Sequence, residues 1–248
     1  MKALILAAGY GKRLQPITNE IPKCMVKVAG ISLLENALNC LADIGVTEIG
    51  IVVGHMADFI KATIQNEWGK RKIPISYYEN AQYMETNNIY SLYKAIDFCT
   101  DDMLLLEADL FYKKTLLEPL LTCSSDCPVL VSPFNPKRMD GTVVSLKDGS
   151  NSVREIILGK WQTKEFNYSA VKKTVNIYRF SGTFAKKYLS LINWYVNNVG
   201  VDSYYEKLLG SMIYLRDFSI SAVEVPETTW CEIDNIHDLN YARELFGK

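Results

Sequence analysis

The sequence predicts an α/β fold, in which helices flank a Rossmann-like, mixed but mostly parallel sheet. Strand and helix patterns alternate through residues 1–135, which is typical of a parallel sheet with both faces covered. The strands are continuous apolar runs, as expected for strands buried on both faces. From about residue 136 the pattern changes to short strands joined by polar loops, so we expect an inserted β/α subregion in the second half.

Short apolar runs rich in β-branched residues predict the strands of the first half, and apolar residues three and four apart predict its helices. The strands are expected at 3–8, 49–53, 75–78, 103–106 and 128–131. The helices are expected at 33–41, 58–68, 88–98 and 115–121. Gly45 follows the first helix and predicts its end.

The second half is expected to order its elements differently. Strands are predicted at 141–146, 153–158, 175–180, 222–225 and 231–234. Helices are predicted at 184–196, 203–215 and 238–246. No internal repeat or low-complexity segment separates these elements, and we interpret residues 1–248 as one domain.

The composition is that of a globular protein and excludes several classes of partner. Of the 248 residues, 48% are hydrophobic and 22% are charged, and the formal net charge is −1. No excess of Lys or Arg indicates a nucleic-acid surface, and no apolar run approaches the length of a membrane span. The apolar segment before Gly9 is too short for a signal peptide, so a cytoplasmic location is expected. Two histidines are too few for a multi-histidine metal site.

The most informative segment is the loop after the first strand. Gly9 and Gly11 can adopt positive φ and let the backbone approach an anion closely, and their N–H groups can form an anion-binding nest. Lys12, Arg13 and Lys23 add three cations within twelve residues. A site that removes water from phosphates has to replace it with N–H groups and cations. The loop therefore predicts a phosphate-binding site.

Two common phosphate-binding motifs do not fit this loop. No Ser or Thr follows Lys12, which makes a P-loop a poor match. Leu14 stands where the dinucleotide fingerprint has its third glycine. An ordinary strand-to-helix turn is the remaining alternative. It is disfavoured by an ordered series of further residues: Arg13, Pro16, Thr18, Pro22 and Lys23.

Two carboxylates are placed at the ends of strands that are far apart in the sequence. Asp109 comes just after the strand at 103–106, and Asp234 ends the one at 231–234. Ligands of such sheets bind beyond the carboxyl ends of the strands, and Mg²⁺ takes one or two carboxylates together with substrate phosphates. The pair therefore predicts a magnesium site. The alternative is that either residue is a turn or capping residue, since a helix follows Asp234.

The run Leu-Ala-Ala-Gly-Tyr-Gly-Lys-Arg-Leu-Gln-Pro-Ile-Thr at 6–18, followed by Pro22 and Lys23, resembles the signature of nucleotidyltransferases that make activated sugars and alcohols. It is most similar to small cytidylyltransferases of the phosphocholine and phosphonate type. The resemblance implies transfer of a nucleoside monophosphate from its triphosphate to a phosphorylated acceptor, with Mg²⁺ and release of pyrophosphate. It also implies a nucleotide-binding half at 1–135 and an acceptor-side half at 136–248 that completes the metal site.

The resemblance and the chemistry of the side chains together assign expected roles. Lys23 and Arg13 are the expected catalytic residues, and Asp109 and Asp234 are the expected Mg²⁺ ligands. The Asn-Asn-x-Tyr-Ser-Leu run at 87–92 either caps a helix or contacts the nucleotide. The expected nucleotide-binding residues are Ala7, Ala8, Gly9, Tyr10, Gly11, Lys12, Arg13, Gly54, Asn87, Asn88, Ser91, Glu107 and Ala108.

The acceptor is predicted from charge. Asp140 favours a primary amine, which can donate hydrogen bonds, over the quaternary ammonium of choline. Choline would instead require an aromatic cage, for which Trp161, Tyr204 and Trp230 are candidates. The expected acceptor-binding residues are Lys23, Asp140, Tyr178, Tyr204, Trp230 and Glu232.

The resemblance, together with the charge of Asp140, implies a cytidylyltransferase that moves CMP from CTP to a small amine-bearing phosphate or phosphonate. Glutamine phosphate or another amino-acid phosphate, aminoethylphosphonate and phosphocholine are the candidate acceptors, with decoration of capsule or cell-surface polysaccharide as the expected role. A sugar-1-phosphate nucleotidyltransferase that uses UTP or dTTP is the alternative, and a non-catalytic nucleotide sensor is the third hypothesis. No nucleic-acid or membrane partner is expected, and a homodimer is kept open.

Overall fold

The computed structural model describes residues 1–69, 73–215 and 218–247, and its core is a nine-stranded sheet. The strands run in the order β10-β9-β11-β6-β1-β4-β5, while β8 pairs with β11 and β12 pairs with β8. Their bounds are β1 Lys2–Ala7, β4 Glu48–Val53, β5 Ile75–Glu79, β6 Met103–Glu107, β8 Pro128–Pro133, β9 Val143–Leu146, β10 Val153–Ile157, β11 Lys172–Phe180 and β12 Ser221–Glu224. The predicted α/β, Rossmann-like class is confirmed.

The strand β1 lies at the centre of the sheet and is buried on both faces. It pairs in parallel with β4 on one side and with β6 on the other. Because successive side chains of a strand point to opposite faces, Ala3 and Ile5 pack in one core while Leu4 and Leu6 pack in a second. This double burial explains why the first strand is a continuous apolar run.

Helices cover the two faces in two groups. The helices α2 (Leu33–Asp43), α3 (Ala57–Trp68) and α5 (Glu118–Thr122) contribute to the core that holds Ile5. The helices α4 (Asn88–Lys94), α6 (Gly182–Asn198) and α7 (Glu206–Tyr214) contribute to the core that holds Leu4. Local signals agree with this arrangement, since Ser32 caps α2 by accepting a hydrogen bond from the Glu35 N–H at 3.1 Å.

The second half of the chain extends the same sheet. Its long strand β11 pairs antiparallel with β6, β8 and β9. The far edge then folds back, because the Val153 N–H donates to the Ile220 carbonyl at 2.8 Å and connects the start of β10 to the segment before β12. The inserted subregion is therefore joined to the first half of the chain through the hydrogen bonds of β11.

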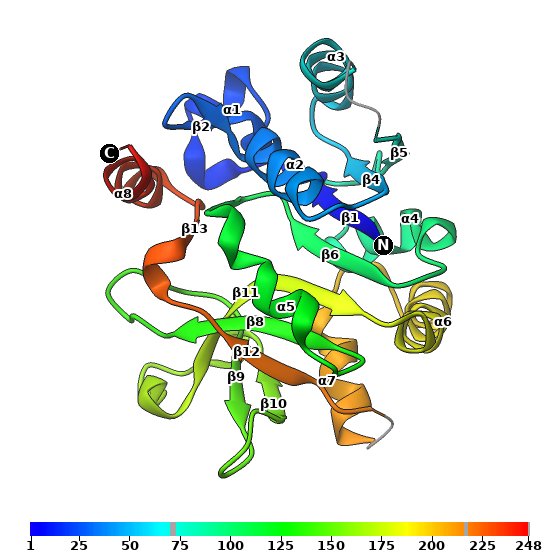
Figure 1. The fold of residues 1–248 in the computed structure, drawn as a ribbon, viewed down its shortest axis with the longest axis vertical. Coiled ribbons are helices and arrows are strands. Elements are labelled where there is room, and N and C mark those ends of the chain that lie inside the picture. The colour runs from blue at the N-terminus through cyan, green and yellow to red at the C-terminus, as the bar shows by residue number, and fades with distance from the viewer. Residues whose placement is uncertain (70–72, 216–217, 248) are drawn as a thin grey trace.

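A third, smaller core lies between the C-terminal helix and the loop that follows β1. The strand β13 (Trp230–Glu232) pairs antiparallel with β7 (Leu110–Tyr112), and the helix α8 (Ile236–Phe246) follows. Leu239 of α8 packs with Leu14 of the first loop and with Val28 of β2 (Lys27–Val28). Figure 1 shows α8 beside this N-terminal segment. The last residues of the chain thus help to position the first loop.

Several element predictions need correction. The helix expected at 88–98 ends at Lys94, and a 3-10 turn follows. Pro119 lies in the first turn of α5, so the helix expected at 115–121 is split into a 3-10 turn and a short helix. The short pairs β2 with β3 (Ile31–Ser32) and β7 with β13 include strands that were not predicted. No helix in the described part of the chain is long and apolar enough to cross a membrane.

Candidate active site

A pocket of about 370 Å³ lies at the carboxyl ends of β1 and β6. This is the edge at which ligands bind in open α/β sheets. Most of the predicted nucleotide and metal residues line it. The lining residues are Leu6, Ala7, Ala8, Gly9, Gly11, Lys12, Arg13, Lys23, Cys24, Asn80, Tyr83, Thr86, Asn87, Asn88, Ser91, Glu107, Ala108, Asp109, Tyr204 and Asp234.

The conformation of Gly11 brings the first loop against Lys23. Gly11 has φ 73° and ψ 39°, the left-handed region that favours glycine. A Cβ atom at this position would lie 2.9 Å from the Cβ of Lys23 and 3.1 Å from the Cγ2 of Thr18. The Thr18 hydroxyl also donates to the Gly11 carbonyl at 2.9 Å. A side chain at position 11 would therefore push Lys23 away from the loop.

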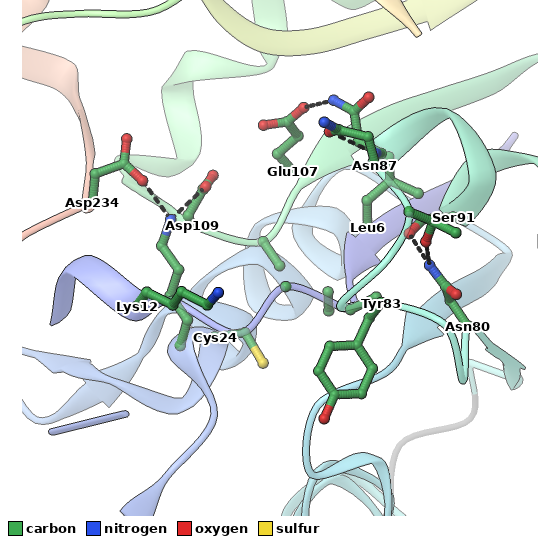
Figure 2. A pocket seen from close by; sticks show the side chains of 18 of the residues that line it. Leu6, Lys12, Cys24, Asn80, Tyr83, Asn87, Ser91, Glu107, Asp109 and Asp234 are labelled. Atoms are coloured by element: carbon green, nitrogen blue, oxygen red, sulfur yellow. Dashed lines mark hydrogen bonds and ion pairs between the residues drawn. The ribbon is translucent and has the colours of Figure 1, made fainter. Parts of the chain in front are cut away.

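Lys23 joins the two aspartates that the sequence singled out. Its Nζ lies 2.8 Å from Asp109 Oδ2 and 2.6 Å from Asp234 Oδ1. Figure 2 shows the carboxylates of Asp109 and Asp234 joined by dashed lines to one nitrogen between them. Asp109 follows β6, and Asp234 follows β13. The strand ends are held together because the Ile233 N–H donates to the Asp109 carbonyl at 2.9 Å.

Arg13 binds the same centre from the first loop. Its Nη2 lies 2.8 Å from Asp234 Oδ2, and its Nη1 lies 3.3 Å from Asp140 Oδ2. Both oxygens of Asp234 are therefore in ion pairs with basic side chains. Asp140, which the sequence placed on the acceptor side, lies next to this centre in an exposed ion pair.

The ion pairs set the protonation of the centre. Burial alone would lower the pKa of Lys23, but Asp109 and Asp234 raise it well above its ordinary value. Burial would raise the pKa of Asp234, whereas Lys23 and Arg13 lower it below its ordinary value. Lys23 is consequently a charged ammonium and Asp234 a charged carboxylate at neutral pH.

The alternative that Asp234 is a helix cap is wrong. Asn235 is the N-cap of α8, and its side chain accepts hydrogen bonds from the N–H groups of His237 and Asp238. Asp238 in turn accepts from the Asn235 N–H at 3.1 Å, which completes a capping box. The Asp234 carboxylate therefore interacts with Lys23 and Arg13 and does not cap the helix.

Asn87 and Asn88 differ in their roles, although both line the pocket. Asn87 caps α4, because its side chain accepts from the Asn88 N–H at 2.9 Å. The Asn88 amide donates to Glu107 and Glu206, both at 3.2 Å, and its oxygen accepts from the Tyr205 N–H at 2.9 Å. Capping therefore explains Asn87, while Asn88 connects β6 to α7.

Sequence reasoning missed part of the pocket on the side of β5. Asn80, which is 1% exposed, follows β5 and donates to Thr86 Oγ1 at 3.0 Å and to Ser91 Oγ at 3.1 Å. Tyr83 also lines the pocket, and its hydroxyl lies 3.4 Å from Nδ1 of His55. The missed signal is that Asn80 follows a parallel strand at its carboxyl end. We call Asn80, Thr86, Asn87, Asn88 and Ser91 the amide–hydroxyl wall.

Acidic residues gather at the ends of β6 and β13, three of them lining the pocket and Glu232 lying beside it. We call Glu107, Asp109, Glu232 and Asp234 the carboxylate cluster. Figure 2 shows Asp109 and Asp234 at one end of the pocket and Asn80 and Ser91 at the other.

A buried lysine supports the cluster from behind. Lys173 is 1% exposed, and its Nζ lies 3.0 Å from Glu232 Oε2 and 2.9 Å from the Thr174 carbonyl. Burial raises the pKa of Glu232 to about 7, Asp234 and Asp109 add to the increase, and Lys173 opposes it. The position of Lys173 behind Glu232 was not predicted from the sequence, because nothing local marks a lysine in a strand as buried.

Three members of the cluster, Glu107, Asp109 and Glu232, fit a divalent metal ion. One carboxylate oxygen from each of Glu107, Asp109 and Glu232 lies within 4.8 Å of the others. The Oδ1 atom of Asp109 is buried and has no hydrogen-bond partner in the described part of the chain. Mg²⁺ prefers such oxygen ligands. Asp109 belongs to the predicted metal pair, whereas Glu107 and Glu232 were predicted for nucleotide and acceptor.

The structure does not bring every predicted residue to the pocket. Tyr178 is fully buried and packs edge-to-face against Tyr205, with ring centroids 5.9 Å apart. Its predicted contact with the acceptor is therefore wrong in this arrangement, because neighbouring side chains cover its ring. Tyr10 packs against His55 with ring centroids 4.4 Å apart, and Gly54 lies against the backbone of Ala8. Neither is among the lining residues.

The candidate aromatic cage is not assembled either. Tyr204 lines the pocket, but Trp161 is 51% exposed and lies in a separate groove beside β10 and α7. Trp230 is 1% exposed and borders a small cavity that Asp140 and Glu232 also line. The three rings therefore do not surround one common volume.

The sequence of this chain is similar to those of known nucleotidyl transferases. The nucleotidyl transferase family model matches residues 2–126. A CMP-5'-(3-aminopropyl)phosphonate synthase from Streptomyces rubellomurinus is 28% identical over 100% of this chain, which spans only 39% of that relative's length. A CTP:phosphoglutamine cytidylyltransferase from Campylobacter jejuni is 26% identical over 96% of this chain and 98% of its own length.

The fold has counterparts among solved structures. The CTP:phosphocholine cytidylyltransferase from Streptococcus pneumoniae superposes with a TM-score of 0.79 at 22% identity, over 98% of each chain. At this identity the likeness concerns the fold. Together with the match over residues 2–126, it confirms the resemblance found in the first loop, and this chain belongs to the nucleotidyl transferase family.

Proposed function

We propose that this chain is a cytidylyltransferase that transfers CMP from CTP to a small amine-bearing phosphate or phosphonate and releases pyrophosphate. The observation that carries the proposal is the position of Lys23, whose Nζ is held by Asp109 and Asp234 in the pocket that the glycine loop lines. A charged ammonium in this place can neutralise charge that develops at an α-phosphate.

The reaction needs positioning more than proton transfer. An acceptor phosphate or phosphonate oxygen attacks the α-phosphorus of CTP in line, the bond to the β-phosphate oxygen breaks, and pyrophosphate leaves. The attacking oxygen is already anionic, so no general base is required. Lys12 and Arg13 would hold the triphosphate, and Lys23 would lie between the α-phosphate and the acceptor.

Asp109 and Asp234 are the residues that we propose as ligands of Mg²⁺. One oxygen each of Glu107 and Glu232 lies within 4.8 Å of an Asp109 oxygen, so these two residues could join Asp109. When bound, Mg²⁺ would screen the charge of the phosphates and of the leaving pyrophosphate. The unpartnered Oδ1 of Asp109 is the atom that best supports this assignment.

The amide–hydroxyl wall supports cytosine as the base. Cytosine offers an N4 donor and acceptors at O2 and N3, and Asn80, Thr86 and Ser91 provide neutral groups of both kinds. The relatives from Streptomyces rubellomurinus and Campylobacter jejuni carry CMP or CTP in their names. Binding of CTP through this wall is our proposal for the present chain.

The carboxylates support an acceptor with a primary ammonium group. Asp140, Glu232 and Tyr204 are the side chains that we propose on the acceptor side. The ion pair of Asp140 with Arg13 is exposed, and such pairs are weak enough to exchange partners. Hydrogen bonds to a charged group contribute roughly 1.5–3 kcal/mol, which gives a primary amine a real advantage over its trimethylated counterpart.

We further propose that residues 1–135 bind the nucleotide and that residues 136–248 bind the acceptor and complete the metal site. Within a cell the product would supply an activated group to cytoplasmic assembly of capsule or surface polysaccharide. A homodimer is the assembly to test first.

The test of the function is a pyrophosphate-release assay of CTP, UTP, dTTP and ATP against a panel of acceptors. We expect turnover with CTP and a phosphorylated or phosphonate amine. Turnover only with UTP or dTTP and a sugar 1-phosphate would establish the alternative. Tight nucleotide binding without turnover on any acceptor would establish a nucleotide sensor.

The test of the acceptor compares kcat/KM for phosphocholine, phosphoethanolamine, aminoethylphosphonate and glutamine phosphate. A primary amine should be preferred by about ten- to a hundredfold, and Asp140→Ala should narrow the difference. A clear preference for phosphocholine would contradict the role of Asp140.

A further inference from the structure

The contacts of Lys23 conflict with the metal site that we propose for the same carboxylates. Lys23 Nζ contacts Asp109 Oδ2 at 2.8 Å and Asp234 Oδ1 at 2.6 Å, so it lies between the two. A metal ion that used these two oxygens, and not only the free Oδ1 of Asp109, would compete with Nζ for the space between them. Two cations cannot share it.

The arrangement leaves Asp234 with no spare oxygen. Lys23 takes Oδ1, and Arg13 takes Oδ2 at 2.8 Å. The Lys23 and Asp234 side chains are 14% and 13% exposed, so water screens the ion pair little. A metal ion that approaches from solution therefore has to compete with the ammonium group of Lys23 for the carboxylate oxygens.

The pocket offers Lys23 a second position. Lys23 lines the same volume as the glycine loop, and its Cβ is held next to Gly11. The base of the side chain thus lies against the glycine loop, while its end faces the space that we assign to phosphates. A phosphate there would provide an anion for Nζ and compensate for the loss of the aspartates.

We propose that Lys23 is an internal cation that holds the metal position between Asp109 and Asp234 and leaves it when nucleotide phosphate enters the pocket. Metal and nucleotide then bind cooperatively, because the same movement of Lys23 frees the carboxylate oxygens for the metal and brings Nζ to the phosphate. This inference rests on the proposed function, since it uses the roles given there to the two aspartates.

The test measures Mn²⁺ binding to the full chain by electron paramagnetic resonance. Without nucleotide, Lys23→Met should bind Mn²⁺ at least about tenfold more tightly than the wild type, because the internal competitor is gone. Arg13→Met is the matched control. It removes the same charge from the same Asp234 but frees only Oδ2, which lies outside the position that Lys23 occupies between the two aspartates. Its Mn²⁺ affinity should therefore stay within about threefold of that of the wild type.

The cooperativity is tested with CMP, whose single phosphate chelates Mn²⁺ weakly. CMP should raise the Mn²⁺ affinity of the wild type at least about threefold and leave Lys23→Met unchanged. Thermal unfolding of each variant checks the fold. If Lys23→Met does not fold, Lys23→Gln, which removes the charge and keeps a donor, replaces it with the same expectation.

Two results would overturn the proposal. One is an equal gain of Mn²⁺ affinity in Lys23→Met and Arg13→Met, which would indicate general electrostatics. The other is an equal effect of CMP on the wild type and Lys23→Met. Either result leaves the function standing if pyrophosphate is still released with CTP. Absence of turnover with every nucleotide is what would overturn the function itself.

Discussion

The two sides of the pocket are built in different ways. The amide–hydroxyl wall comes from one continuous stretch, residues 80–91, and part of it is satisfied within that stretch, as Asn80 is by Thr86 and Ser91. Asn87 and Asn88 also reach distant segments. The carboxylate cluster comes from the ends of β6 and β13, and its charges are balanced by Lys23 and Lys173 from two further segments. Neutral polar groups can be satisfied locally, whereas buried charges need partners from across the fold.

This contrast predicts that substitutions in the carboxylate cluster have the largest effects. Asp109→Asn and Asp234→Asn keep the shape of the side chain and remove a charge from the proposed metal site. Each should lower Mg²⁺-dependent turnover by about 10³-fold or more, since metal ions contribute several kcal/mol to such reactions. The measurement is the rate across a Mg²⁺ titration, with circular dichroism as the control for folding. A variant with the Mg²⁺ dependence of the wild type would remove that residue from the metal site.

Lys173→Met tests whether the cluster depends on its distant counterion. Removing one partner of a buried ion pair leaves an uncompensated charge and typically costs about 3–5 kcal/mol. We expect the free energy of unfolding to fall by about this amount in chemical denaturation at a pH above the Glu232 pKa of about 7, where this carboxylate is charged. Lys172→Met is the matched control, because the ion pair of Lys172 with Glu224 is on the surface and should contribute less than about 1 kcal/mol. Equal costs for the two variants would show that Lys173 is not needed to balance the cluster.

Lys23→Ala tests whether the cation that balances the carboxylate cluster also contributes to the rate of the reaction. Lys23 is proposed to act on the α-phosphate in the transition state, so the variant should lose about 10²–10³-fold in kcat. The affinity for CTP should change much less, because the other loop residues bind the triphosphate. A near-normal kcat with only a raised KM for CTP would assign Lys23 to ground-state binding.

The smallest expected effect is a pH dependence of stability that arises in the cluster. The pKa of Glu232 is about 7 in the folded protein, above that of the unfolded chain. Between about pH 4.5 and 7 the folded protein therefore binds a proton that the unfolded chain has lost, and stability decreases as the pH rises through this window. Glu232→Gln should flatten the decrease, which chemical denaturation at pH 5, 6 and 7 would measure. An unchanged profile would place the titration elsewhere.

The sequence predicted the features that depend on short-range order. The glycine loop, the ends of β1 and β6, and Asp109 and Asp234 all follow from apolar runs that stop at a polar residue. The capping role of Asn87 was one of two interpretations that the sequence left open, and the structure supports it.

Features that depend on long-range packing were beyond the sequence. Lys173 lies in β11 with ordinary strand neighbours, and only the fold places it behind Glu232. Tyrosine is a residue type that often contacts ligands, but the ring of Tyr178 in β11 is buried in the core. Element ends were misplaced where one residue changes the backbone, as Pro119 does in α5.

The position of β11 has a consequence for any attempt to cut the chain in two. Residues 1–135 alone would lack the strand that covers one edge of β6 and would expose an unpaired edge that favours aggregation. Residues 136–248 alone would lose both β6 and β8 as partners of β11. Neither fragment should fold in isolation. The two fragments produced together should reassemble through the pairing of β11 with β6 and β8. The chain is therefore a candidate for a split reporter in which activity returns only when the fragments meet.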